Sequence, residues 1–156
     1  MQGRLTEEVN AEVLFHDRYT LVVGETSKWA RRRRVELADL VDEPWVMTPL
    51  DALGDAFLAN AFAVRGLKPP SLVITTFSIH LRNNLVAGGN FITSLPESVL
   101  RICGKRYALK ELPIELSVRP PVAVATLRNR TLGPVVQSFI ACAREAAKSY
   151  AGRPAT

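Results

Sequence analysis

The chain has 156 residues, of which 47% are hydrophobic and 22% charged, a size and composition typical of one folded domain with a substantial core. No apolar run approaches the roughly 20 residues of a membrane-spanning helix, and the start MQGRLTEEVN is too polar for an export signal. We therefore expect a cytoplasmic protein with no membrane partner. Cys103 and Cys142 lie far apart without CxxC or Cys/His spacing, which favours free buried thiols and predicts no metal site.

The net charge of +5 and the run Arg31 to Arg34 raise the question of nucleic-acid binding. The run has no interleaved aromatic residues for base stacking, and acidic residues follow it closely, at Glu36, Asp39, Asp42 and Glu43. We interpret it as a solvated loop or a surface ion-pair cluster in preference to a phosphate site.

The first half of the chain alternates short apolar segments with polar ones. Val9 to Phe15 and Tyr19 to Gly24 are predicted strands joined by a turn at 16–18, and Trp45 to Thr48 is a further short strand. Alternation of such strands with helices is typical of a parallel α/β sheet.

A helix is predicted from Asp51, as its cap, to Arg65. Gly66 should end it, and Pro69-Pro70 should prevent its resumption. The helix has two apolar ridges, one of Leu53, Phe57, Ala61 and Val64 and one of Leu58 and Phe62. They indicate either a wide core face or a face that meets a partner subunit.

Ser71 to Thr76 is a predicted strand, and the following segment, SIHLRNNLVAGGNFITSLPESVL, combines a helix start, a helix, a stop, a strand and a second helix start. Ser78 can cap a helix whose apolar face is Ile79, Leu81, Leu85 and Val86. Gly88 and Gly89 should supply the left-handed backbone that ends this helix. Phe91 to Leu95 then reads as a covered strand, and Pro96 suits the first position of a helix.

Near the carboxyl terminus, Thr131 can cap a helix that Pro134 opens. An apolar stripe repeats along it at helical spacing, at Val135, Val136, Phe139, Ile140, Ala143, Ala146 and Ala147. Such a stripe must be buried, either against the few neighbouring strands or against another copy of the chain.

In the order of its segments the chain resembles the effector-sensing part of LysR-type transcriptional regulators. The segment from Ser78 to Leu100 is similar to that family's helix, VAxG-like turn, strand and Leu-Pro dipeptide. FHDRYTLVVGE (15–25) and VELADLVDEPWVM (35–47) resemble its crossover strand and its next helix and strand, and LPIEL (112–116) with 124–148 resembles its return to the first lobe and its closing helix. Nearly the whole chain is covered.

The resemblance implies an α/β, periplasmic-binding-protein type II-like fold, of which this chain holds one complete lobe plus the closing strand and helix of an incomplete first lobe. The implied boundaries are 1–20 for the end of the incomplete first lobe, 21–120 for the second lobe, and 121–156 for the return strand and closing helix. The family's winged helix-turn-helix is not seen in the chain, so we expect DNA contact only through that missing domain. Homo-oligomers are also implied.

Ligands of open α/β sheets bind beyond the carboxyl ends of the strands. The candidate effector-binding residues there are Thr48, Thr76, Phe77, Ser78, Thr93 and Leu95. In the family, matching positions line the cleft between lobes and take a small anion such as a carboxylate. For Thr48 and Ser78, simple helix capping is an equal alternative.

Three classes of function are compatible with these sequence features. The favoured one is the effector-sensing region of a LysR-type regulator, which controls transcription in the intact protein. A solute-binding protein of a transporter shares the fold, but it would need an export signal. An enzyme on this fold would need a phosphate loop, paired carboxylates or a nucleophile beside a histidine, and none is recognisable, so we predict no catalytic residues and no cofactor.

Overall fold

The computed structural model describes residues 8–48, 56–70 and 72–150 and divides the chain into two compact units. The central unit is Arg18–Val118, and the terminal unit combines Met1–Asp17 with Arg119–Thr156. The assignment of these units to the lobes of a two-lobed protein stays a prediction.

The described part of the central unit has strands β2 (Tyr19–Gly24), β3 (Trp45–Met47), β4 (Leu72–Thr75), β5 (Thr93–Pro96) and β6 (Leu109–Glu111). β2 lies between β5 and β6 and is antiparallel to both, whereas β3 and β4 are parallel. A parallel bridge between Trp45 and Ile92 connects β3 to the segment that leads into β5. The β3, β4 and β5 strands therefore run in the same direction, and their carboxyl ends lie at one edge.

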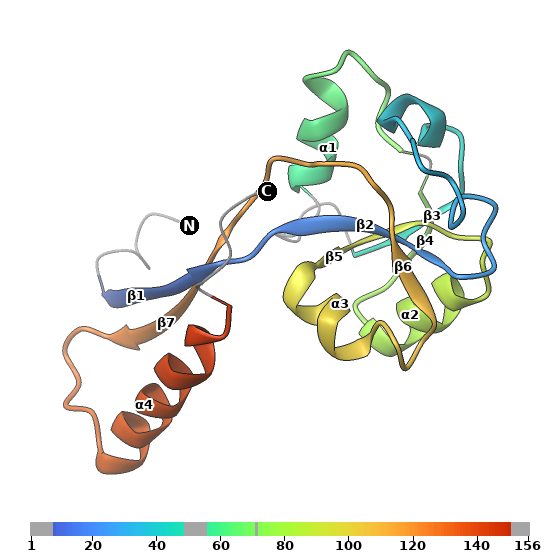
Figure 1. The fold of residues 1–156 in the computed structure, drawn as a ribbon. Coiled ribbons are helices and arrows are strands. Elements are labelled where there is room, and N and C mark those ends of the chain that lie inside the picture. The colour runs from blue at the N-terminus through green and yellow to red at the C-terminus, as the bar shows by residue number, and fades with distance from the viewer. Residues whose placement is uncertain (1–7, 49–55, 71, 151–156) are drawn as a thin grey trace. The chain divides into compact units, whose positions relative to one another are not determined.

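The helical elements of the central unit are η1 (Leu37–Leu40), α1 (Ala56–Ala63), α2 (Ile79–Ala87) and α3 (Glu97–Cys103). Figure 1 shows α1 on one side of the strands and α2 and α3 on the other. Side chains alternate along β2 accordingly, since Leu21 contributes to the core that contains Phe62, and Val22 to the core that contains Val86.

Two details of the predicted sheet are wrong. The sheet is mixed, because β2 runs against its neighbours, and apolar alternation carries no information about strand direction. Residues 16–18 form no turn: the Asp17 N–H donates to Pro120 O (3.0 Å) and the Tyr19 N–H to Val118 O (3.2 Å). Residue 16 is thus the last residue of β1 (Val9–His16), and residues 17 and 18 precede β2 without turn geometry.

The buried face of α2 also differs from its predicted apolar face. Arg82, Asn83 and Val86 are buried, whereas Ile79 and Leu81 are exposed. Asn83 Nδ2 donates to Cys103 Sγ across 3.6 Å. The buried face of α2 therefore includes a polar contact with α3, where the sequence pattern predicted apolar packing. Tertiary contacts therefore decide the orientation of this helix.

The ends of α2 follow the predicted chemistry with one change. Ser78 is the N-cap, and its Oγ accepts the Leu81 N–H at 3.3 Å. Only Gly89, with φ of +83°, is left-handed, while Gly88 keeps helical geometry. Pro96 is the N-cap of α3 and not its first helical residue.

For α1, the predicted cap Asp51 lies outside the described residues. Leu58 and Phe62, the second predicted ridge, are buried as a core face, and so is Ala61 of the first ridge, but Val64 at the end of the first ridge is exposed. Gly66 has φ of +67°, and its N–H bonds to Ala63 O at 2.9 Å, which confirms the predicted helix stop.

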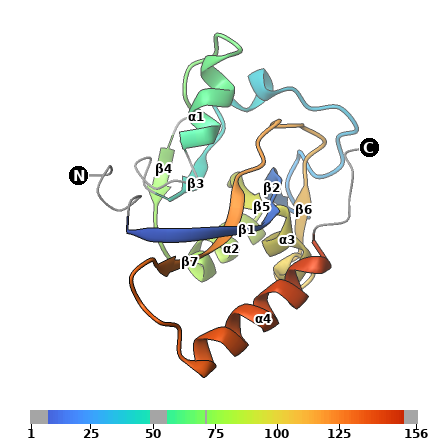
Figure 2. The same ribbon diagram turned by 90° about the vertical axis from the view of Figure 1, so that its left-hand side faces the viewer.

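The terminal unit contains β1 paired antiparallel with β7 (Pro121–Leu127), together with α4 (Pro134–Lys148). Figure 2 shows α4 running beside this pair of strands. Pro134 opens the helix as predicted, but the N-cap is Gly133 and not Thr131, and no side chain caps this end.

The apolar stripe of α4 is only partly covered in the described residues. Ile140 and Ala147 are buried, but Val135 is 82% exposed and Phe139 65% exposed.

The two thiols also differ from the expectation that both are buried, since Cys142 on α4 is exposed. Cys103 is half-buried, and burial raises the pKa of its thiol.

Candidate functional site

The candidate site begins where β3 and β4 end. Met47 pairs with Thr75, and the Thr76 N–H donates to Met47 O at 2.9 Å, so the parallel pairing continues to the last residues of both strands. Thr48 and Thr76 consequently follow their strands at the same edge. Both are half-buried.

The first turn of α2 continues from this edge. Thr76 Oγ1 accepts the Ser78 N–H at 3.0 Å, and Ser78 Oγ in turn caps the helix. Phe77 between them is 77% exposed. The edge therefore combines hydroxyls, an exposed ring and the amino end of a helix, where N–H groups without intrahelical partners favour anions.

The two candidates on β5 lie deeper than the other four. Thr93 and Leu95 are both fully buried, and they pair with Val22 and Thr20 on β2. Leu95 packs in the core beside α2 and α3. Thr93 Oγ1 is buried without a hydrogen-bond partner among the described residues. The structure thus brings Thr48, Thr76, Phe77 and Ser78 together and places Thr93 and Leu95 in the interior.

Sequence reasoning missed a polar cluster at the carboxyl end of β5. Arg18 bonds Glu97 Oε2 through Nε at 3.0 Å and contacts Glu111 Oε1 through a terminal nitrogen at 2.8 Å. Thr20 Oγ1 also donates to Glu111 Oε1, at 2.8 Å. Burial disfavours the charged guanidinium, but the two carboxylates outweigh it and raise the pKa of Arg18 above its ordinary value. The partners are distant in sequence, so no local pattern signals the cluster.

A second missed contact joins α2 to the segment after α3. His80 Nδ1 lies 2.6 Å from the Tyr107 hydroxyl, and Asn84 Nδ2 donates to the His80 carbonyl at 2.8 Å. His80 is exposed and lies on the first turn of α2. This contact fixes the position of that turn relative to Tyr107.

The basic run from Arg31 to Arg34 is an exposed loop, as predicted. Of the ion pairs formed among the described residues, none involves these four arginines. Glu36 and Asp39 instead form a reciprocal capping box around η1. The solvated-loop interpretation therefore fits better than a surface ion-pair cluster.

The geometry of the described side chains and helices also bears on metal binding and membrane spanning. Across residues 8–48, 56–70 and 72–150, no group of three or more His, Cys, Asp or Glu side chains is arranged to hold a metal ion. Within the same residues, no helix has both the length and the apolar character needed to cross a membrane.

Comparison with known proteins identifies a family for this fold. A family model described as the LysR substrate binding domain matches residues 2–148. The HTH-type transcriptional regulator GbpR of Azospirillum brasilense is 27% identical over 116 residues, which are 73% of this chain and 34% of that protein. The chain thus spans about a third of that relative's length.

Solved structures show the same fold. The regulatory domain of CcmR from Synechocystis PCC6803, in complex with 2-PG, gives a TM-score of 0.75 at 19% identity and covers 93% of this chain and 70% of that one. The effector binding domain of QuiR in complex with shikimate gives a TM-score of 0.74 at 18% identity, covering 97% and 70%. The chain therefore belongs to the LysR substrate-binding domain family, the effector-sensing region of LysR-type regulators.

Proposed function

We propose that this effector-sensing region binds a small anion, such as a carboxylate, at the edge formed by Thr48, Thr76, Phe77 and Ser78, and that binding controls transcription in an intact cytoplasmic regulator. The observation that carries the proposal is the position of the α2 amino end directly after β4, beside the end of β3. Shikimate, the ligand of the QuiR domain, carries a carboxylate, which agrees with this chemistry. Thr93 and Leu95 would shape the floor of the site from the interior.

The expected affinity is weak. An anion at a partly exposed helix end gains about 0.3–1 kcal/mol from the aligned backbone dipoles, and hydroxyl groups add hydrogen bonds. Ser78 contributes both an exposed hydroxyl and the N-cap, so its substitution affects ligand binding and folding together. An informative experiment must separate these effects.

Two substitutions at Ser78 separate them. Ser78→Ala removes the cap and the hydroxyl, so it should lower the free energy of unfolding by about 1 kcal/mol and weaken anion binding. Ser78→Asp keeps a capping oxygen but places a negative charge at the site, so it should preserve stability and abolish the anion response. Thermal shift with shikimate, benzoate and acetate, matched for ionic strength, measures both properties.

The contrast between the two variants decides the proposal. If Ser78→Asp responds to these carboxylates as the unaltered chain does, Ser78 is a cap only and the anion site lies elsewhere. If Ser78→Asp loses the response but retains its melting temperature, the site is supported independently of folding. Ser138→Asp on exposed α4 is the control for a general charge effect.

Partners beyond the effector follow from the same proposal. Since residues 2–148 match a substrate binding domain, we assign DNA contact to a separate helix-turn-helix domain and expect that these 156 residues by themselves do not select a DNA sequence. An anisotropy titration at physiological salt tests this expectation. Selective binding that survives competitor DNA would contradict it.

A further inference from the structure

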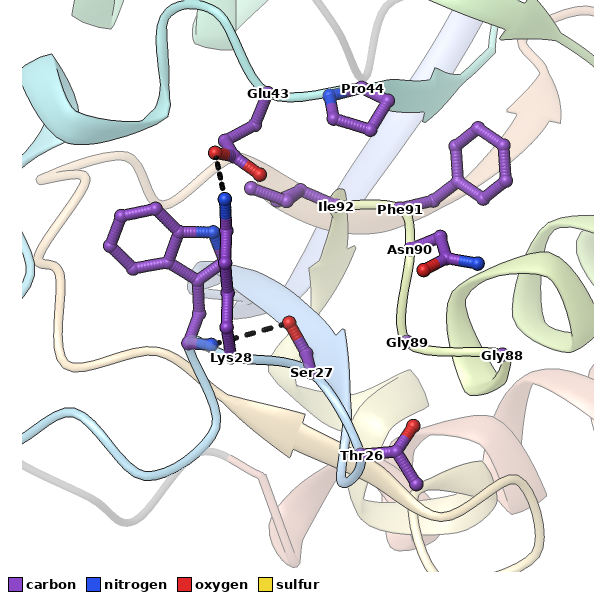
Figure 3. A pocket seen from close by; sticks show the side chains of 11 residues that line it. Thr26, Ser27, Lys28, Glu43, Pro44, Gly88, Gly89, Asn90, Phe91 and Ile92 are labelled. Atoms are coloured by element: carbon purple, nitrogen blue, oxygen red, sulfur yellow. Dashed lines mark hydrogen bonds and ion pairs between the residues drawn. The ribbon is translucent and has the colours of Figure 1, made fainter.

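A cavity of about 480 Å³ opens at the other edge of the central unit, where β2 ends and β3 and β5 begin (Figure 3). Three loops form its wall: 26–29, 43–44 and 88–92. It shares no residue with the candidate anion site. The Ile92 N–H donates to Pro44 O at 3.0 Å, and the Ser27 N–H to Gly24 O at 2.9 Å, so backbone bonds hold the loops in place.

Gly89 shows how closely two of these loops approach. A Cβ atom at this position would clash with Thr26 Oγ1, and the Gly89 φ of +83° is a left-handed conformation that other residues rarely adopt. The wall of the cavity is therefore built by the fold itself and does not depend on a ligand to bring the loops together.

An ion pair crosses the cavity between two of its loops. Lys28 Nζ lies 2.6 Å from Glu43 Oε1 and 5.2 Å from the centre of the Trp29 ring. The Glu43 side chain is only 20% exposed, whereas that of Lys28 is 68% exposed. The carboxylate is thus part of the wall, and the ammonium reaches it on a solvated, flexible stem.

This geometry defines a cation site that the ammonium group of Lys28 occupies. A carboxylate beside the face of an aromatic ring is the combination that attracts an ammonium group. Figure 3 shows the Glu43, Lys28 and Ile92 side chains pointing toward one another from separate segments. Pro44, which is half-buried, adds apolar surface beside the charged pair, whereas Ile92 is only 2% exposed.

We propose that this cavity is a second ligand site, which binds a small primary alkylammonium compound through Glu43 and Trp29 after displacement of the Lys28 ammonium. Displacement should be easy, because an exposed ion pair contributes little to stability. The alkyl chain of the ligand would lie against the half-buried ring of Pro44. The site accepts the opposite charge from the anion site at the other edge.

The test titrates the isotopically labelled chain with n-butylammonium chloride and follows the Trp29 indole N–H by NMR. The Trp45 indole is an internal control, since its Nε1–H is buried and donates to Leu40 O at 3.0 Å. n-Butanol in sodium chloride of equal ionic strength is the matched neutral probe. The variants are Lys28→Ala, which removes the competing ammonium, and Glu43→Gln, which removes the carboxylate but keeps its shape.

Saturable shifts of the Trp29 signal with butylammonium are expected, but not with butanol. Lys28→Ala should bind up to about fivefold more tightly, the equivalent of an exposed ion pair of about 1 kcal/mol. Glu43→Gln should weaken binding about tenfold or more. Equal responses to the ammonium and the alcohol, unchanged binding in Glu43→Gln, or no saturable response in Lys28→Ala would each overturn the proposal.

Discussion

The central and terminal units hold their apolar residues very differently. In the central unit, Trp45, Phe62 and Leu40 are completely buried between strands and helices. In the described part of the terminal unit, the buried apolar side chains are Ile140 and Ala147. Val135 and Phe139 belong to an apolar stripe with helical spacing and are nevertheless exposed, so such a pattern shows which side chains favour burial but not whether they are buried.

Polar and aromatic contacts tie the terminal unit together. Arg144 donates two hydrogen bonds of 2.7 Å to the Glu12 carboxylate, linking α4 to β1. Phe15 stacks on Tyr150 with ring centres 5.0 Å apart. Because exposed ion pairs contribute little, we expect the terminal unit to be the less stable of the two.

The largest expected effect comes from the core of the central unit. Phe62→Ala should lower the free energy of unfolding by about 3–5 kcal/mol, because it leaves a cavity beside Trp45, whose ring lies 5.9 Å from that of Phe62. Urea unfolding followed by tryptophan fluorescence measures the change, since Trp45 reports on this core.

Phe139→Ala on α4 is the matched control for that substitution. The same atoms are removed from a ring that is 65% exposed, so the loss should stay below about 1 kcal/mol. Equal losses in the two variants would show that the α4 stripe is as well packed as the central core, and the contrast between the units would fail.

The elements of the central unit could be predicted because their signals are local. Ser78 and Gly66 mark helix ends by their own hydrogen bonds and backbone angles, and the structure confirms both. The orientation of α2 could not be predicted in this way. Its buried Asn83 donates a hydrogen bond to Cys103, which lies on another helix. The local periodicity of the α2 sequence cannot indicate a partner that is distant in sequence.

The candidate anion site is predictable to a similar extent. Strand ends and a capping serine place Thr76 and Ser78 at an edge, because both are properties of neighbouring residues. The Arg18 cluster and the Lys28–Glu43 pair were missed, since each depends on loops that meet only in the folded chain. Charged residues in loops give no sign of their partners until the topology is known.

The second prediction concerns the exposed face of α4. We define this face as Val135, Val136 and Phe139. Apolar side chains in contact on one helix favour burial against a second copy. We expect concentration-dependent association in analytical ultracentrifugation, weakened about tenfold or more by Phe139→Asp because a charge would be buried in the contact. Ser138→Asp, on the exposed polar side, should have no effect. A monomer at every concentration would refute the proposed contact.

Arg18 in the central unit and Arg144 in the terminal unit allow a third comparison. Arg18 is partly buried and bonded to two carboxylates, so Arg18→Met should reduce stability on the order of 1 kcal/mol, because Glu97 and Glu111 lose their guanidinium partner and only the Thr20 hydroxyl still donates to Glu111. Arg144→Met removes a more exposed pair and should cost less. Urea unfolding in low and high salt distinguishes the two, because screening should reduce the Arg144 effect more. A larger loss from Arg144→Met would reverse the expected order.

The smallest effect is the pH dependence of the terminal unit. Hydrogen bonds from Arg144 hold the pKa of Glu12 below its ordinary value. A carboxyl group with a lowered folded-state pKa stabilises the fold above the unfolded pKa of about 4.3, and this contribution is lost as the pH falls through the folded-state pKa. Glu12→Gln should therefore be less stable than the unaltered chain near neutral pH, and the difference should shrink steadily below about pH 4.3.

Hydrogen exchange of the α4 amides between pH 3 and 7, corrected for intrinsic rates, measures this difference within the terminal unit. If the difference is constant across the range, the ion pair does not stabilise α4 through its charge, and the stacking of Phe15 on Tyr150 is the main tie between β1 and the end of the helix.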